Sequence, residues 1–198
     1  MASGRRLLLG VTGMLLTLFT VSCDNPFRPN MRKQTETPAA ATADSPTQLL
    51  LNLEDAYNRR DIDLYKECLH PAFRFVLISS ESNDVGVDMD ADGVSDDWWD
   101  YDVEVRYHEN LFGYGSGDGL IPPPVSIDLD LQIPPEDAWM LDNQDSELDQ
   151  IVIPCYFDLR LTYTGNYQDI TASGYSLFFV TQTDGVWTIS RWQDQSSI

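Results

Sequence analysis

Four aspartates recur in one short stretch of the chain, and their spacing suits a calcium ion. They stand at relative positions 1, 3, 5 and 9, counted from Asp88, and Gly93 occupies position 6. Carboxylates at alternate positions of a tight loop can converge on one point, and a glycine permits the sharp turn that this requires. The sequence therefore predicts a structural calcium loop within residues 84–100. Its predicted ligands are Asp88, Asp90, Asp92, Asp96 and the backbone carbonyl oxygen of Val94, with Asp97 or Asp100 closing the shell.

The loop resembles the first part of an EF-hand-type calcium loop and the thrombospondin-type calcium repeats, with one departure. Position 12 is Trp99, where an EF-hand has a bidentate glutamate. The alternative is a solvated acidic turn, since Asp and Gly are common in turns. Nine acidic residues and no basic residue lie between Asp84 and Glu104, a density that repels itself unless a cation neutralises it. We expect weak calcium binding, with a dissociation constant on the order of 0.1–1 mM.

A second set of polar side chains alternates along one predicted strand. Tyr156, Asp158 and Arg160 share one face of this strand. If that face lines an interior pocket, burial would shift the pKa of Asp158 and make it the best candidate for a catalytic base. If the face lies in solvent, the three residues belong to an ordinary half-exposed sheet, which is the more common origin of such alternation.

Tyr57, His108 and Trp192 are the remaining candidates for a pocket. His108 could act as a base, but it lies on the apolar face of a predicted helix, where a hydrogen-bonded structural histidine is more common. The chain shows no Ser-His-Asp order, no glycine-rich phosphate loop and no motif for an organic cofactor. The catalytic candidates are therefore Asp158, Tyr57 and His108. The predicted pocket consists of Tyr57, Tyr156, Asp158, Arg160 and Trp192.

Two cysteines, Cys68 and Cys155, lie outside the N-terminal segment. One is predicted on a helix and the other on a strand, so helix-to-sheet packing could join them as a disulfide in an oxidising compartment. The alternative is two buried free thiols that pack as small apolar side chains. Neither histidine forms a zinc-ligand pattern with a nearby cysteine.

The elements that would position these residues follow an α+β order. Ser45, with a proline after it and a glutamine three residues on, predicts a helix start, and apolar residues in 49–57 recur on one helical face. Asp61 can cap a second, short helix. Residues 98–112 alternate like a strand and also repeat like a helix face, and we predict a helix there. The predicted strands are Phe73–Ile78, Val125–Ile133, Gln150–Tyr163, Ile170–Gln182 and Val186–Gln193.

Several segments resemble the nuclear-transport-factor-2-like superfamily. Residues 53–61 (LEDAYNRRD) and 69–75 (LHPAFRF) are similar to its opening helices and first strand, residues 104–112 to its third helix and residues 184–192 to its last hairpin. The resemblance covers residues 45–197. It implies a cystatin-like cone, in which a strongly curved antiparallel sheet wraps around about three helices, with an apolar pocket at the open end. Its relatives include ketosteroid isomerase and SnoaL-like cyclases, which use a carboxylate base in such a pocket, and a sheet-to-sheet homodimer is compatible with it.

The beginning of the chain resembles a bacterial lipoprotein signal. Arg5 and Arg6 precede an uncharged, apolar run of 16 residues, which leads directly to Cys23. The resemblance implies cleavage before Cys23 and acylation of that cysteine; an ordinary cleaved signal and an uncleaved anchor are the alternatives. The predicted division is a signal peptide (1–22), a lipidated cysteine with a flexible tether (23–44) and a domain (45–198) in the bacterial cell envelope, facing the periplasm or the cell exterior.

The composition fits an acidic exported protein, with a formal net charge of −20 and only two lysines. Such a charge repels phosphates, so a nucleic-acid partner is excluded, and membrane attachment must rest on the acyl chains of Cys23. Two functions remain open. One is a non-catalytic domain that binds a small apolar ligand or a protein; the other is a small pocket enzyme, an isomerase, dehydratase or hydrolase, that acts on an apolar metabolite. We expect the first, because no catalytic set carries over residue by residue.

Overall fold

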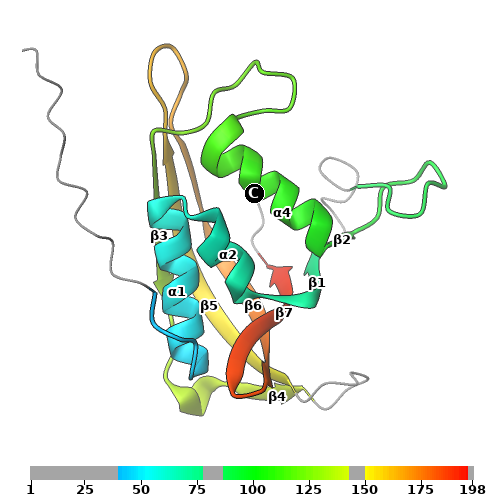
Figure 1. Cartoon of the computed structure of the whole chain (residues 1–198), viewed down its shortest axis with the longest axis vertical. Coiled ribbons are helices and arrows are strands. Elements are labelled where there is room, and N and C mark those ends of the chain that lie inside the picture. Colours follow the sequence, from blue (N-terminus) through cyan, green and yellow to red (C-terminus); the bar gives the residue numbers. More distant parts are fainter. Residues whose placement is uncertain (1–39, 78–86, 143–149, 196–198) are drawn as a thin grey trace, which may run out of the picture. The chain divides into compact units, whose positions relative to one another are not determined.

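Helices lie against a curved sheet in the part of the chain that the structure describes (Figure 1). The computed structural model describes residues 40–77, 87–142 and 150–195. The predicted signal peptide, Cys23, most of the tether and residues 84–86 of the acidic loop lie outside the described residues. The helices are α1 (Pro46–Arg59), α2 (Ile62–Cys68), α4 (Tyr101–Glu109), the π-helix η1 (Asn110–Tyr114) and the 3-10 helix η2 (Glu136–Ala138). The strands are β1 (Leu69–Val76), β2 (Trp98–Asp100), β3 (Ser126–Gln132), β4 (Met140–Asp142), β5 (Gln150–Thr162), β6 (Ile170–Thr183) and β7 (Val186–Asp194).

Each α-helix begins at a side-chain cap of the kind that the sequence favours. The Ser45 hydroxyl accepts a hydrogen bond from the backbone N–H of Gln48, and the Asp61 carboxylate accepts one from Leu64. The Asp100 carboxylate accepts one from the backbone N–H of Val103, at the start of α4. The first two caps confirm the predicted helix starts. The third places the start of α4 three residues beyond Trp98.

The sheet is mixed, which corrects the prediction that it is antiparallel. Its strands follow the order β2-β1-β7-β6-β5-β3, with β4 also paired to β5. All the described strand pairs are antiparallel except β1 with β7, which is parallel. A tight hairpin forces β6 and β7 to run in opposite directions, whereas β1 and β7 are far apart in sequence, so the connection permits either direction. Local sequence patterns therefore carry no information about this pair.

The core lies between the helices and the inward face of the sheet. In Figure 1, α1, α2 and α4 lie in front of the strands. Alternate residues of β3 and β5 point inward and are buried, while their neighbours point outward. The fully buried members from the helices and the sheet include Leu49, Leu50, Leu53, Ala56, Tyr65, Ile153, Cys155, Phe178, Val180 and Ile189.

Helix α1 also closes one edge of the sheet. The Asn58 side-chain amide accepts a hydrogen bond from the backbone N–H of Leu129 at 2.7 Å and donates one to the carbonyl oxygen of Leu129 at 3.0 Å. The Glu54 carboxylate accepts a further bond from the backbone N–H of Leu131 at 2.9 Å. Because an edge strand otherwise presents unpaired backbone groups, these two side chains protect β3 from pairing with another chain.

Some elements differ from the predictions by more than one or two residues. Strand β1 begins at Leu69 rather than Phe73. The predicted helix in 98–112 begins at Tyr101, after the short strand β2, and the residues that alternate like a strand lie within this helix. Strand β4 was not predicted.

Contacts with the domain begin before Ser45, because the carbonyl oxygen of Ala43 accepts a hydrogen bond from the backbone N–H of Trp187. None of the helices within the described ranges is long and apolar enough to cross a membrane.

Candidate functional site

Five hydrogen-bonding side chains meet inside the cone, and we call them the interior polar cluster. They are Tyr57 of α1, Tyr65 of α2, Trp99 of β2, and Glu104 and His108 of α4, and each is at most 8% exposed. Glu104 and His108 are four residues apart, so they share one face of α4. The cluster therefore depends on the packing of three helices and one strand.

Glu104 is the centre of the interior polar cluster. Its Oε1 accepts a hydrogen bond from the Tyr65 hydroxyl, and its Oε2 accepts one from the indole N–H of Trp99, each at 2.5 Å. Both carboxyl oxygens are therefore paired, although the side chain is only 2% exposed. A buried carboxyl group without such partners would carry a large desolvation penalty. The hydrogen bonds from Tyr65 and Trp99 offset this penalty for Glu104.

His108 connects Glu104 to Tyr57. Its Nδ1 lies 3.0 Å from the carbonyl oxygen of Glu104 and 3.3 Å from the Oε1 of that residue, and its Nε2 lies 2.6 Å from the Tyr57 hydroxyl. Because Nδ1 faces two acceptors, a neutral imidazole carries its proton there and accepts a hydrogen bond from Tyr57 at Nε2. The imidazole ring also stacks on Tyr65, with 4.0 Å between the ring centroids.

Burial shifts the ionisation of three members of the cluster. It raises the pKa of Tyr57 and of Tyr65 well above the usual value of a tyrosine, and the nearby Glu104 carboxylate raises both further. Burial also lowers the pKa of His108, against the opposing effects of the Glu104 carboxylate and backbone carbonyl. The cluster therefore holds neutral tyrosines and a neutral imidazole at pH 7.

The protein should lose stability as the pH falls below about 6.5, the usual pKa of an unfolded histidine. In that range the unfolded chain binds a proton at His108 that the folded chain does not bind, since the pKa of His108 is lowered by burial and only partly restored by Glu104. The free energy of unfolding should then rise with pH through this window and level off above it. Denaturant titrations from pH 5 to pH 8 measure the slope.

The matched comparison uses the two histidines of the chain. The variant His108→Gln should flatten this part of the pH profile, whereas His70→Gln should leave it in place, because His70 lies outside the interior polar cluster. Equal slopes for wild type and His108→Gln would contradict the assignment.

Aromatic rings of η1 and of the sheet pack around the cluster. Phe112 lies 5.4 Å from Tyr57 between ring centroids, and Trp192 lies 6.5 Å from Tyr57. Trp192 in turn packs against Phe178 and Phe75, at 4.8 and 5.5 Å. The interior that Tyr57 and Trp192 were predicted to line is therefore aromatic and apolar, and both residues lie there.

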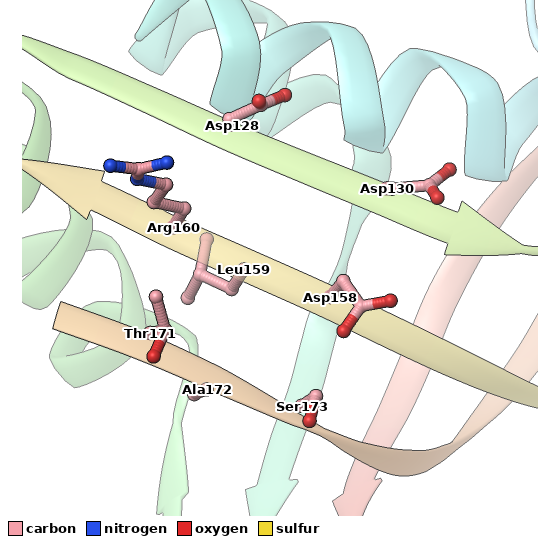
Figure 2. Close-up of a pocket in the computed structure, with 8 residues that line it drawn as sticks. All are labelled: Asp128, Asp130, Asp158, Leu159, Arg160, Thr171, Ala172 and Ser173. Carbon is pink, nitrogen blue, oxygen red and sulfur yellow. The ribbon is translucent and has the colours of Figure 1, made fainter.

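The other predicted pocket residues lie on the outer face of the sheet, so the pocket prediction is wrong for Tyr156, Asp158 and Arg160. Asp158 and Arg160 are exposed and line an open hollow of about 350 Å³ together with Asp128 and Asp130 (Figure 2). The physical reason is the register: the inward positions of β5 belong to the apolar set that alternates with them. The solvent-exposed alternative is thus the correct one.

The outer hollow is acidic. Asp130 lies directly opposite Asp158 across the β3–β5 pair, and Arg160 forms an ion pair with Asp169 at 3.1 Å rather than with Asp158. Like charges at directly opposite positions are unfavourable. A homodimer formed sheet to sheet would bring two such surfaces together, so it would need cations between them.

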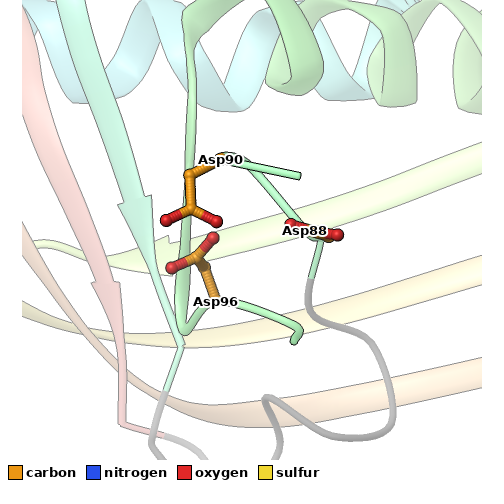
Figure 3. A group of neighbouring side chains, drawn as sticks. All are labelled: Asp88, Asp90 and Asp96. Carbon is orange, nitrogen blue, oxygen red and sulfur yellow. The ribbon is translucent and has the colours of Figure 1, made fainter. Parts of the chain in front are cut away.

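The acidic loop gathers three of its predicted ligands. Carboxylate oxygens of Asp88, Asp90 and Asp96 lie within 4.8 Å of one another, and Figure 3 shows Asp90 and Asp96 pointing toward each other. The Asp88 carboxylate also accepts hydrogen bonds from the backbone N–H groups of Asp92 and Gly93. These oxygens have the chemistry that calcium prefers.

The remaining predicted ligands have other positions. The Asp92 carboxylate accepts a hydrogen bond from the backbone N–H of Val94, whose side chain is exposed. Asp100 caps α4 through one carboxyl oxygen, and the carbonyl oxygen of Asp97 accepts a bond from the backbone N–H of Leu77. Among the described side chains, Asp88, Asp90 and Asp96 are therefore the group whose carboxylates lie close enough together to share an ion.

Cys68 and Cys155 are free, buried thiols, which agrees with the second of the two alternatives. Burial raises the pKa of each thiol to about 12. A thiol with such a pKa is a poor nucleophile at neutral pH, so both cysteines act as packing residues.

Three members of the interior polar cluster were not predicted as site residues: Tyr65, Trp99 and Glu104. The spacing of Glu104 and His108 was a usable signal, since residues four apart share a helix face. No such signal exists for Tyr65 and Trp99, because their contact with Glu104 joins segments that only the fold brings together.

The fold of this chain is similar to those of several solved structures. A protein of Novosphingobium aromaticivorans named for scytalone dehydratase is 10% identical, with a TM-score of 0.51 over 77% of this chain and 81% of the other. A conserved protein of Planctomyces limnophilus is 8% identical, with a TM-score of 0.50 over 75% and 90%. An NTF-2-like protein of unknown function from Shewanella oneidensis is 15% identical, with a TM-score of 0.41 over 74% and 93%.

The fold is therefore the α+β cone that these solved structures share, which is the fold that the resemblance seen in the sequence implied. At these identities the likeness establishes the fold alone. No family model and no curated protein sequence matches this chain.

Proposed function

We propose that this chain is a lipid-anchored protein of the bacterial cell envelope whose cone binds a small, mainly apolar ligand without transforming it. The observation that carries the proposal is the pairing inside the cone. The polar atoms of Glu104, Tyr65, Trp99 and His108 bond to one another or to Tyr57, so they form a supporting network rather than a set of free reactive groups. Asp158, the best candidate for a base if its face lined the cone, lies on the outer face of the sheet.

The aromatic surroundings favour an apolar ligand. Tyr57, Phe112, Trp192 and Phe178 pack against one another in the interior of the cone. Ligand sites of this kind are predominantly apolar, with few polar groups that fix orientation. The anchor is supported by the charged start of the chain, the apolar run of residues 7–22 and Cys23.

Binding without turnover can be tested with the mature chain made unacylated through Cys23→Ser. The probes are 1-tetralone and tetralin, two bicyclic molecules of ligand size. At about 100 times the dissociation constant, either should raise stability by about 2.7 kcal/mol and the thermal midpoint by about 5–10 °C. Mass spectrometry of the recovered probes should show no chemical change.

The control variant is Asp158→Asn, which alters the outer hollow but not the interior and should bind the probes as wild type does. Failure of both probes to bind would contradict the proposal, and so would equal loss of binding in Asp158→Asn and in an interior variant such as Trp192→Phe.

A small pocket enzyme is the second candidate, and the contact between Tyr57 and His108 is the observation that favours it. A neutral imidazole 2.6 Å from a tyrosine hydroxyl accepts a hydrogen bond from it and orients the hydroxyl, whose oxygen can in turn accept a hydrogen bond from a substrate. Conversion of a bound substrate, together with its loss in Tyr57→Phe and its retention in Asp158→Asn, would establish this function in place of the first.

The proposal includes a structural calcium ion in the acidic loop, bound by Asp88, Asp90 and Asp96. Calcium at 10 mM should raise the thermal midpoint by about 3–10 °C if the dissociation constant is on the order of 0.1–1 mM, because an ion bound only by the folded state adds stability by mass action. Differential scanning calorimetry with and without the ion measures the shift.

Charge-matched variants separate a bound ion from general screening. Replacing Asp88 and Asp90 with Asn should abolish the calcium-dependent shift in the thermal midpoint. Replacing Asp128 and Asp130 with Asn removes the same charge from the outer face of the sheet and should preserve this shift. An equal shift in both double variants, or none in wild type, would leave only an acidic turn.

A further inference from the structure

The outer face of the sheet carries three rows of side chains that cross β3, β5 and β6 in register. The balanced row is Asp128, Arg160 and Thr171, the acidic row is Asp130, Asp158 and Ser173, and the tyrosine row is Gln132, Tyr156 and Tyr175. Successive rows are two residues apart along each strand, so their side chains point to the same side of the sheet. Figure 2 shows the balanced row and the acidic row around the outer hollow.

The acidic row carries negative charge that no base in the same row offsets. Among the residues that line the hollow, Arg160 is the only base; it lies opposite Asp128 and forms its ion pair with Asp169. Asp130 and Asp158 are exposed and lie directly opposite each other. Like charges at such positions are unfavourable, so a cationic group placed on this row would stabilise the protein.

The carboxylates of the outer hollow are spaced for separate cationic groups rather than for one metal ion. Among the described residues, the three carboxylates that converge within 4.8 Å are those of Asp88, Asp90 and Asp96 in the acidic loop. Opposite and diagonal positions of a sheet are about 4.5–5.5 Å and 7–8 Å apart between Cβ atoms. Each carboxylate of the hollow can therefore accept hydrogen bonds from its own guanidinium or ammonium group.

The tyrosine row adds aromatic surface beside these acids. Tyr156 and Tyr175 pack edge to face, with 5.2 Å between their ring centroids, and Tyr175 is 59% exposed. A guanidinium group stacks on such rings and is attracted to their faces, more effectively than a strongly hydrated ammonium group. Carboxylates and rings in adjacent rows therefore favour arginine over lysine.

The charge of the chain selects a different protein over a second copy as the occupant. Residues 45–198 contain 29 acidic residues and seven basic ones. The basic residues that already form ion pairs within the chain are Arg59, Lys66, Arg160 and Arg191. A second copy would bring acidic groups against acidic groups, whereas a basic partner would supply the missing charge.

We propose that the acidic row and the tyrosine row form a docking surface for a basic segment of a partner protein, and that this segment presents arginine side chains at alternate positions. In an extended segment such side chains are roughly 7 Å apart, which is also the spacing of the rows. One arginine then pairs with Asp130 and Asp158, and the next stacks on Tyr175. This surface lies on the opposite side of the sheet from the interior polar cluster, so the proposal goes beyond ligand binding in the cone.

Two matched peptides test the proposal, acetyl-GRGRG-amide and acetyl-GKGKG-amide. Heteronuclear NMR titration of the unacylated mature chain should show that the arginine peptide binds about threefold or more tightly than the lysine peptide and shifts the resonances of Tyr156, Tyr175 and the acidic row. The double variant Asp130→Asn, Asp158→Asn should bind the arginine peptide about tenfold or more weakly, because it loses charge-assisted hydrogen bonds. Its thermal midpoint should not fall, since the substitution removes a like-charge contact.

Two control variants separate this surface from general attraction by an acidic protein. Glu136→Gln with Asp137→Asn removes the same charge from exposed positions outside the hollow and should keep the affinity for the arginine peptide within about threefold of wild type. Tyr175→Leu keeps an apolar side chain but removes the ring, so it should abolish the preference for arginine while leaving the affinity for the lysine peptide nearly unchanged.

Three results would overturn the proposal. The first is the absence of binding by wild type, and the second is equal weakening in the two double variants, which would show that net charge alone attracts the peptide. The third is a wild-type dimer in sedimentation experiments that Tyr175→Leu dissociates, which would assign this face to a second copy of the chain.

Discussion

Replacing Glu104 by alanine should lower the free energy of unfolding by about 3–5 kcal/mol, the loss typical of removing one partner from a buried polar network. The substitution leaves the Tyr65 hydroxyl and the Trp99 indole N–H buried without their acceptor. Each such orphaned group destabilises the folded state by about 1–3 kcal/mol, and the loss of packed side-chain volume adds to this. Urea denaturation measures the change, which corresponds to a fall of roughly 10 °C or more in the thermal midpoint.

A neighbouring glutamate on the same helix provides the matched control. Glu109 forms an ion pair with Lys66 at 2.8 Å, but both side chains are partly exposed, at 39% and 33%. Surface pairs of this kind contribute about 0–1 kcal/mol, so Glu109→Ala should be nearly neutral. Similar losses for Glu104→Ala and Glu109→Ala would show that the buried network is not a principal source of stability.

Replacing Cys23 by serine should move the protein almost entirely from the membrane fraction to the soluble fraction of cells. The sequence predicts that cleavage and acylation both act at this cysteine, and the described helices offer no alternative span. An acyl chain contributes about 0.8 kcal/mol per buried CH₂ group, so loss of the lipid removes essentially all of the membrane affinity. Fractionation and phase separation in detergent measure the change.

Ser22→Ala is the control for this prediction, because it keeps a small residue before the cleavage site and should leave the protein in the membrane fraction. Mass spectrometry of the wild-type protein supplies the contradicting outcome: a chain that keeps its first 22 residues and carries no acyl group on Cys23 would mean that the apolar run is an uncleaved anchor.

Local interactions are what the sequence by itself determined. The helix starts at Ser45 and Asp61 could be predicted because a cap bonds to a backbone N–H three residues away. The inward faces of α1 and the long strands could be predicted because burial follows the 3.6-residue and two-residue periods. The superfamily resemblance rested on the same local patterns, so the fold class followed from them.

Long-range packing decided the rest. The parallel pairing of β1 with β7 depends on how distant strands align, and it is not encoded in a short segment. The interior polar cluster joins residues up to 51 positions apart, as in the bond between Tyr57 and His108. A side chain finds such a partner only after the chain has collapsed around a shared core, because the entropy of ordering distant segments is offset by the whole core and not by any one pair.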